Sequence, residues 1–310
     1  MPTVGDAVTR TKRLLNSNTR TELDAIHTTI TAAATTIRLK YQTDGIRAGS
    51  YISVGDDTQG YETMYVHARN GEYATVQRGI DGSTAVAFTG DITDTGVVDT
   101  AIEVEPRFTA HQIHEAVKDA ILAMPNNLYG VETTEVSFST TQQSITTAFS
   151  KGFNQVLSAT RTARAGEDRL LSFNVKVQEY DGAYEVIRQE GIEKAVTVNL
   201  TYAHPFVTST LNLGTDLVAT VGMTVEMTDI PALGAAASLL LGEESLRLDL
   251  HSQGDSRSDA AVAAGDRARY SLVLQARYDR RVSEEARRLM SKWGVRTGAV
   301  TSSVFPTTVR

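Results

Sequence analysis

Residues 49–91 most constrain what this chain can fold into, because short runs of alternating apolar and polar residues are separated there by turn residues. The alternation around residues 51–54 and 64–66 has the period of a half-buried β-strand. Asn70-Gly71 follows the second run and predicts a hairpin with a type I′ turn, in which both central residues need φ > 0. A second turn is predicted at residues 78–84, which contain Gly79 and Gly82. The stretch therefore predicts a β-meander, and it holds no catalytic constellation.

The composition favours β-rich modules over a single dense enzyme core. A length of 310 residues exceeds what one hydrophobic core usually organises, so we expect two or three sub-domains. Aromatic residues make up only 6% of the chain, whereas Thr, Ala and Ser are plentiful. The net charge of −7 gives no general reason to bind nucleic acid or an anionic membrane. The lack of cysteine excludes disulfides, thiol nucleophiles and cysteine-based metal sites.

The sequence predicts neither secretion nor membrane insertion. Residues 1–15 include basic side chains but are not followed by the apolar run of a signal peptide. The longest apolar run, at residues 230–241, is well short of the roughly twenty residues that span a bilayer. We therefore expect a soluble protein that is synthesised in a cytoplasm and has no membrane partner.

The order of patterns along the chain predicts an α+β fold. A helical assembly core is expected, from which two mainly antiparallel β modules extend as excursions. The predicted segments are an N-terminal helix (1–18), a first β module (19–105), a central helix (106–127), a second β module (128–229), a C-terminal helical region (230–293) and an extended tail (294–310).

Local signals predict several element ends and one buried face. Asp6 is the expected N-cap of the first helix, and Thr109 is the expected N-cap of the central helix. Strand-like sequence begins at Thr29, and Pro231 is expected to open the C-terminal helical region. In the last helix an apolar stripe at helical spacing predicts the buried face. Its members are Tyr270, Val273, Leu274, Tyr278, Val282, Leu289 and Trp293.

Two histidines on the central helix are the first candidate for metal binding. His111 and His114 lie three residues apart, a spacing that can serve a metal ion. A site also needs further ligands, and only Glu115 is close in sequence. We therefore interpret the pair as surface or interface residues.

A stretch in the first β module has a weak likeness to a calcium loop, but its spacing misses the EF-hand rule. The residues concerned are Asp56, Thr58, Gly60 and Glu62. The chain also contains no GxSxG, P-loop, HExxH or Gly-rich dinucleotide motif. We therefore expect no metal, no cofactor and no enzymatic activity.

The last helix and the tail form a basic part of the chain. From Arg277 to Arg310, eight basic residues face three acidic ones, a local net of +5 in a chain of net −7. This asymmetry predicts contact with an acidic partner surface or with DNA, and the alternative is a solvated face with pairs such as Glu284 and Arg288. The candidate partner-binding residues are Arg280, Arg281, Arg287, Arg288, Lys292, Trp293, Arg296, Phe305 and Arg310.

Several short motifs, taken in order, resemble those of tailed-bacteriophage neck proteins, the head-to-tail adaptors or connectors. They are GIR at 45–47, YISVG at 51–55, ETMYV at 62–66, VQRGIDGST at 76–84, PRF at 106–108, TYAHPF at 201–206, DIPALGAA at 229–236 and EEARRL at 284–289. The resemblance covers nearly the whole chain, and the ETMYV and VQRGIDGST strands also resemble modules of other phage structural proteins.

The resemblance implies a non-enzymatic virion protein that is made in a host bacterial cytoplasm. It implies a ring of identical subunits, commonly twelve, between the portal protein and the next neck or tail protein. DNA would pass through the lumen without sequence-specific binding. The helical part would face the ring and the portal, and the tail at residues 294–310 is expected to add extended backbone to a neighbouring ring.

Two other functions stay open at the level of the sequence. One is a different phage tail, collar or baseplate protein, whose β modules bind neighbouring subunits or the host surface. The other is a carbohydrate-active enzyme or binding module, which needs clustered surface aromatics or two carboxylates about 5–9.5 Å apart. The sequence offers no obvious pair of that kind.

Overall fold

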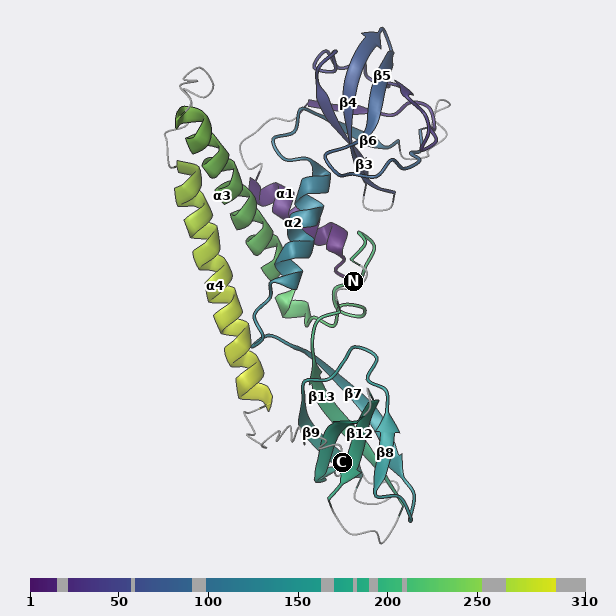
Figure 1. Ribbon diagram of the computed structural model, residues 1–310, viewed down its shortest axis with the longest axis vertical. Helices are drawn as coiled ribbons and strands as arrows, with labels where there is room; N and C mark the ends of the chain where they lie inside the picture. The colour runs from purple at the N-terminus through teal and green to yellow at the C-terminus, as the bar shows by residue number, and fades with distance from the viewer. Residues whose placement is uncertain are drawn as a thin grey trace, which may run out of the picture. The chain divides into compact units, whose positions relative to one another are not determined.

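The computed structural model of the protein describes residues 1–15, 22–56, 59–90, 99–162, 170–180, 183–189, 195–207, 211–252 and 266–293. The fold is α+β with antiparallel sheets, which confirms the predicted fold class (Figure 1). The chain divides into two compact units. Within the described residues, the first unit takes in residues 1–123, 211–217 and 228–281, and the second takes in residues 124–207, 218–227 and 282–293.

The first unit combines one six-stranded antiparallel sheet with a group of helices (Figure 1). Its strands are β1 (Glu22–Ala25), β2 (Thr36–Arg38), β3 (Tyr51–Asp56), β4 (Gly60–Asn70), β5 (Tyr73–Ile80) and β6 (Ala101–Val104). Its helices are α1 (Val4–Leu15), α2 (Ala110–Leu122), α3 (Ile230–Ser252) and the first part of α4 (Asp266–Trp293). The sequence did not predict β1, because a strand of four residues is too short to show a clear alternation.

The six-stranded sheet closes on itself. Its order is β1-β6-β3-β4-β5-β2, so β1 and β2 are the two edges. Just beyond these edges, Ile26 and Leu39 form an antiparallel bridge, and the Lys40 N–H donates to the Ala25 carbonyl at 2.9 Å. Closure satisfies edge groups that would otherwise stay open to strand addition. The interior is filled by one apolar cluster that includes Ile26, Ile37, Leu39, Ile52, Met64, Val76, Phe88 and Ile102.

A buried ion pair lies inside this sheet. Glu62 on β4 is fully buried, and the side chain of Arg78 on β5 is 7% exposed. Arg78 donates from Nε and Nη2 to the two oxygens of Glu62 at 2.7 and 2.6 Å. Its other donors go to the backbone carbonyls of Thr31, Ala34 and Val86. All five guanidinium N–H groups are thus used, which is what a buried cation requires.

The hairpin between β4 and β5 forms where the sequence predicted it, but its turn is one residue later. Asn70 pairs with Tyr73, so the two-residue loop consists of Gly71 and Glu72. Gly71 has φ of 59°, whereas Asn70 and Glu72 do not have positive φ. The predicted type I′ turn is therefore wrong, because only the first loop residue has the left-handed conformation, as in type II′ turns.

The first part of helix α3, residues 230–242, is apolar around its circumference and lies between other helices. A Cβ atom at Gly234 would lie 3.2 Å from Tyr278 of α4 and 3.3 Å from Ala120 of α2. On further sides, Thr11 of α1 donates to the Ala232 carbonyl, and Ser271 of α4 donates to the Ala237 carbonyl at 2.8 Å. Small residues on α3 let the neighbouring helices approach closely. A helix that is contacted on several sides has no polar face, which explains its composition.

This composition also gives the segment Val225–Gly242 the length and hydropathy of a membrane span. Half of the segment is buried inside the protein, and the core helix of a globular unit meets the same criterion. The apolar run at residues 230–241, which is shorter than the roughly twenty residues that span a bilayer, forms the first part of α3. Within α3, Ile230, Ala235 and Ala236 are fully buried.

The helix starts agree with the sequence in one case and differ in the other. Thr109 caps α2 as predicted, and Gln112 completes a capping box with it. The predicted cap at Asp6 is wrong, because α1 begins at Val4 and Thr3 occupies the cap position. Thr3 Oγ1 accepts from the Asp6 N–H at 3.1 Å, and the Asp6 carboxylate accepts from the Thr3 N–H at 2.8 Å. Asp6 is therefore the third residue after the cap, and its carboxylate bonds back to the backbone of the cap residue.

The second unit is built on two antiparallel sheets. One has the order β10-β9-β13-β7 and the other β11-β12-β8. The strands are β7 (Gly130–Phe138), β8 (Ser144–Thr147), β9 (Gln155–Thr162), β10 (Leu170–Ser172), β11 (Val175–Tyr180), β12 (Ala183–Arg188) and β13 (Val196–His204). A short 3₁₀ turn, η1 (Val225–Met227), belongs to the same unit, and residues 207–229 contain no strand among those described.

Aromatic side chains fill the core of the second unit. Phe149 lies 5.0 Å from Phe153, 5.3 Å from Tyr184 and 4.5 Å from Tyr202, measured between ring centroids. Phe173 is also buried, and it separates β10 from β11. The sequence of residues 169–180, RLLSFNVKVQEY, predicts one strand through this point. The structure instead divides it between the two sheets, because both sheets contribute side chains to one core.

A buried histidine lies between two glycines of the second unit. His204, at the end of β13, is 1% exposed and its Nδ1 lies 2.8 Å from the Pro205 carbonyl. A Cβ atom at Gly130 or Gly222 would lie 2.2 Å from the His204 ring. Glycine is therefore required at both positions. Burial lowers the pKa of His204, so the ring is neutral in the folded protein.

We predict that Glu62→Ala destabilises the first unit by about 3–5 kcal/mol, because it leaves the Arg78 guanidinium buried without its counter-charge. The control is Glu72→Ala, which removes a more exposed partner from Arg38 and is expected to cost less than about 1 kcal/mol. Urea unfolding of both variants measures the difference. Equal losses would show that the buried pair is not the stronger constraint.

We also predict that His204 makes the second unit less stable in acid. The folded-state pKa lies below the unfolded value of about 6.5, so below that pH the unfolded chain binds the proton first. The free energy of unfolding should fall as pH drops from about 6.5 toward the folded-state pKa. Urea unfolding at pH 7.5 and 5.5 should show a larger loss for the wild type than for His204→Gln. The same loss in both proteins would contradict this role.

Candidate interaction surface on helix α4

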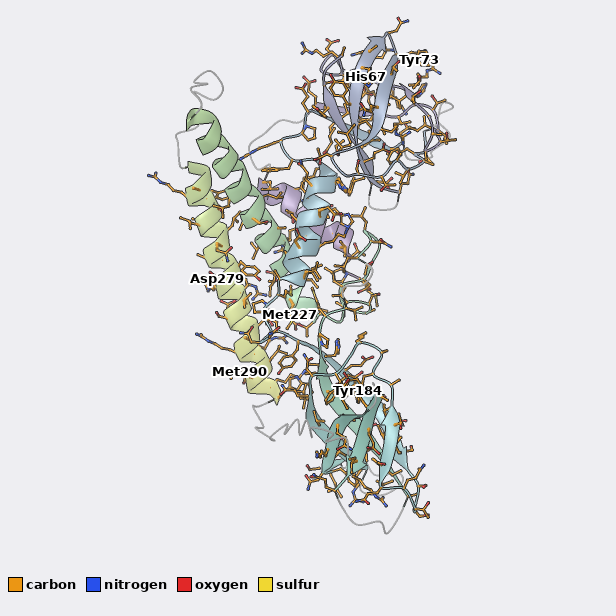
Figure 2. The ribbon with its side chains drawn as sticks, viewed as in Figure 1. His67, Tyr73, Tyr184, Met227, Asp279 and Met290 are labelled. Atoms are coloured by element: carbon orange, nitrogen blue, oxygen red, sulfur yellow. The ribbon has the colours of Figure 1, made fainter. Side chains whose placement is uncertain are left out.

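Helix α4 has one buried face and one exposed face. Its buried positions are Ser271, Leu274, Val282, Glu285, Ala286 and Leu289. On the other side Leu272 is 68% exposed, Val273 is 48% exposed and Met290 is 54% exposed. Asp279 and Met290 are labelled on α4 in Figure 2. Leu272 and Val273 are adjacent, and exposed apolar side chains that form a contiguous patch rimmed by polar residues are a feature of interaction surfaces.

The predicted apolar stripe of α4 was therefore right in part. Leu274, Val282 and Leu289 are buried as predicted. Tyr270 and Val273 are exposed instead, and polar side chains occupy two buried positions. Ser271 is accommodated because its hydroxyl donates to α3, and Glu285 because it accepts from Arg288 at 2.6 Å. Local hydrogen bonds thus let the buried face depart from the simple apolar pattern.

The predicted site residues of α4 in the first unit differ in role. Arg281 donates to both carboxylate oxygens of Asp229, at 3.1 and 3.2 Å. Arg10 approaches the same carboxylate at 3.8 Å. Arg281 therefore joins α4 to the start of α3 and is a structural residue. Arg280 is exposed, and so is Arg277, which makes no ion pair with a residue that the structure describes.

In the second unit, Arg288 is also held by its own chain. It contacts Glu285, the Thr224 hydroxyl at 2.8 Å and Glu226 at 3.2 Å. The predicted pair of Arg288 with Glu284 differs from these contacts, because Arg288 pairs with Glu285, three residues before it. Exposed positions are Arg287 and Lys292, and the Lys292 ammonium lies 5.1 Å from the Trp293 ring centroid.

Three further candidates, Arg296, Phe305 and Arg310, lie outside the described residues. The described candidates do not converge on one cavity. Arg281 and Arg288 bond to Asp229, Thr224 and Glu226, and Arg280, Arg287 and Lys292 are at exposed positions, with Lys292 beside Trp293. Sequence reasoning did not identify Leu272 as a surface residue. Leu272, Val273 and Leu274 are consecutive apolar residues, so their pattern does not show which of them face the core.

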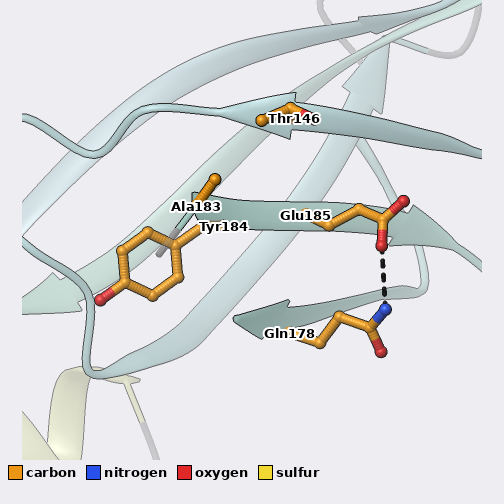
Figure 3. A pocket seen from close by; sticks show the side chains of 5 residues that line it. All are labelled: Thr146, Gln178, Ala183, Tyr184 and Glu185. Carbon is orange, nitrogen blue, oxygen red and sulfur yellow. Dashed lines mark hydrogen bonds between the residues drawn. The ribbon is translucent and has the colours of Figure 1, made fainter. Parts of the chain in front are cut away.

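One shallow pocket lies on the second unit and has a volume of about 360 Å³ (Figure 3). Thr146, Gln178, Ala183, Tyr184 and Glu185 line it. Glu185 accepts from Gln178 at 2.9 Å, and hydrogen bonds from Ser144 and Gln178 lower the pKa of Glu185. A general acid needs a raised pKa, so this carboxylate is unsuited to that role.

A second pocket, of about 200 Å³, lies in the first unit between α1, α2 and the sheet. Lys12 and Glu103 form an ion pair there. The lining also includes Ser53, Asp56 and Tyr61. Ser53 Oγ accepts from the Ala110 N–H at 3.3 Å, and Asp56 accepts from the Gln59 N–H at 2.7 Å, so both side chains already hold contacts to the backbone.

Residues of the two sequence patterns that were considered for metal binding, and not predicted to bind it, have other contacts in the structure. His114 Nε2 lies 3.0 Å from the Leu211 carbonyl, and burial lowers its pKa. In the stretch that resembles a calcium loop, the Glu62 carboxylate accepts from Arg78, and the Asp56 carboxylate accepts from the Gln59 N–H. Thr58 lies outside the described residues. Among the described residues, no group of three histidine or acidic side chains has an arrangement that could hold a metal ion.

Comparisons with known proteins do not identify the chain. No protein-family model matches it, and a search of curated proteins finds no significant relative. Function must therefore be argued from the surface of the molecule and from the residues that carry the resemblance.

We predict that the α4 arginines separate into two groups on mutation. Arg281→Ala should destabilise the protein by about 1–3 kcal/mol, because Asp229 is partly buried and loses charge-assisted hydrogen bonds. Arg287→Ala, at an exposed position, should change stability by less than about 0.5 kcal/mol. Urea unfolding distinguishes the two variants. A large loss for Arg287→Ala would mean that this side chain also has a structural role.

Proposed function

We propose that this protein is a non-enzymatic structural component of a tailed-phage virion. In this proposal it is a head-to-tail adaptor, a ring of about twelve copies between the portal protein and the next neck or tail protein. DNA passes through the channel without sequence-specific binding. The observation that carries the proposal is the exposed face of α4, where Leu272 and Val273 lie among arginines.

An assembly role is supported by the chemistry of both pockets. The acidic side chains that line them are already bonded within the chain, Glu185 to Gln178, Glu103 to Lys12 and Asp56 to the Gln59 N–H. By contrast, exposure of the apolar side chains of α4 to water is unfavourable, and association with another protein would bury them. Contact with other proteins is therefore better supported than catalysis.

The ring geometry adds a second physical argument. In a ring, each subunit repeats the same contact with its neighbours, so modest contacts add up through multivalency. A broad helix surface without a deep pocket suits that kind of assembly. We further propose that residues 294–310 reach the portal by adding extended backbone to its surface.

Negative-stain electron microscopy of the protein mixed with its portal protein tests the proposal. We expect rings stacked on the portal in class averages, with the portal's rotational symmetry or a matching one. Labelled protein found only at the tail tip would overturn the adaptor role and favour a baseplate protein. Removal of residues 294–310 provides a separate test of the tail, because full portal binding after this deletion would contradict its role.

A further inference from the structure

Six residues on the first part of α4 form what we name the leucine–arginine face. They are Arg269, Leu272, Val273, Ala276, Arg277 and Arg280, and the structure exposes all of them. Leu272 and Ala276 are one turn apart, and so are Val273 and Arg277. All six belong to the first unit, so their exposure is a property of one compact body.

The composition of this face favours a protein over DNA. Helix α4 contains seven arginines and one lysine. Arginine is enriched at protein interfaces, whereas lysine is depleted. DNA backbone binding needs positive charge and gains nothing from an exposed leucine and valine at the centre of the contact. The face therefore fits a protein surface that offers both apolar and acidic side chains.

Charge excludes a symmetric contact between two copies of α4. The helix carries eight basic and four acidic residues, a net of +4, while the whole chain has a net charge of −7. The remainder of the chain therefore carries −11. Two α4 faces placed together would repel, whereas α4 placed against another part of a second copy would be attracted.

Helix α2 exposes a row of the matching kind. Glu115, Asp119 and Leu122 follow one another at spacings of four and three, which places them along one side of the helix. The Glu115 side chain is 46% exposed and accepts from Lys118 at 2.7 Å, Asp119 is exposed, and Leu122 is 60% exposed. This acidic–leucine row faces solvent and, like the leucine–arginine face, belongs to the first unit.

The two surfaces cannot satisfy each other within one copy in the described arrangement. Gly234 of α3 lies against both Ala120 of α2 and Tyr278 of α4, so α3 is interposed between the two helices. Figure 1 shows the same order of helices. Both surfaces stay exposed in the single chain, so the surface of a second copy can reach each of them.

We propose that the leucine–arginine face of α4 in one copy binds the acidic–leucine row of α2 in a neighbouring copy. The contact joins two different surfaces, so it is heterologous and repeats from copy to copy. Such a contact closes into a ring when the rotation between copies allows it. The inference rests on the proposed ring and names the surfaces that would form it.

The absence of cysteine gives a direct test with the full-length chain. Leu122→Cys and Leu272→Cys are combined in one protein and oxidised mildly, because a disulfide forms only when the two Cα atoms come within about 7 Å. We expect a ladder of linked dimers, trimers and larger species. Mixing the two single variants should give linked dimers and nothing larger. The control protein carries Leu23→Cys together with Leu272→Cys. Leu23 lies on β1 and is 60% exposed, so its cysteine is accessible, but the control should give no ladder.

The outcomes separate the interface from the function. A ladder equal to that of the Leu23→Cys control, or linked dimers from Leu272→Cys alone, would overturn the proposed pairing. Portal-bound rings without the ladder would overturn the pairing and leave the adaptor role in place. A ladder from a protein that does not bind the portal would support the pairing and overturn the adaptor role.

A charge exchange tests the same contact without a covalent link. Arg277→Glu and Asp119→Arg should each weaken self-association by about tenfold, and the double variant should recover most of the loss. Sedimentation measures association and circular dichroism checks folding. No recovery in the double variant would overturn the pairing. The pairing would also be overturned if the single variants changed DNA binding and left self-association at the wild-type level.

Discussion

The buried pair of Glu62 and Arg78 is the interaction on which the first unit depends. Two charges without water are tolerated only when every donor and acceptor has a partner. Here the carboxylate also accepts from the Gly79 and Val86 N–H groups, and the guanidinium bonds to the carbonyls of Thr31 and Ala34. One pair thus joins two central strands to two loops, which restricts how the sheet can close.

The helices of the first unit depend on a different constraint, the closeness that small side chains allow. Gly234 leaves room for Ala120 and Tyr278, and the carbonyls of α3 accept from Thr11 and Ser271. Because α3 is occupied on these sides, α2 and α4 retain outward surfaces. The same packing that stabilises the helices therefore leaves Leu272 of α4 and Leu122 of α2 exposed.

The candidate site shows why charge alone did not identify its working residues. The sequence predicted a basic surface that includes Arg280, Arg281 and Arg288, and all three lie on α4. Arg281 and Arg288, however, bind Asp229, Glu226 and Thr224, which are distant in sequence. Residue type predicts that an arginine will find an anion or remain in water, but only the fold determines which of the two occurs.

Neighbouring residues were enough to predict the α+β class, the hairpin near Gly71, the cap at Thr109 and a helical region that ends at residue 293. Contacts across the fold were needed to establish that Thr3 caps α1, that Phe173 divides a predicted strand, and that Leu272 and Val273 face outward. The tertiary structure also decided that Glu62 pairs with Arg78. These outcomes require contacts between segments far apart in the chain, and local periodicity contains no information about which segments meet.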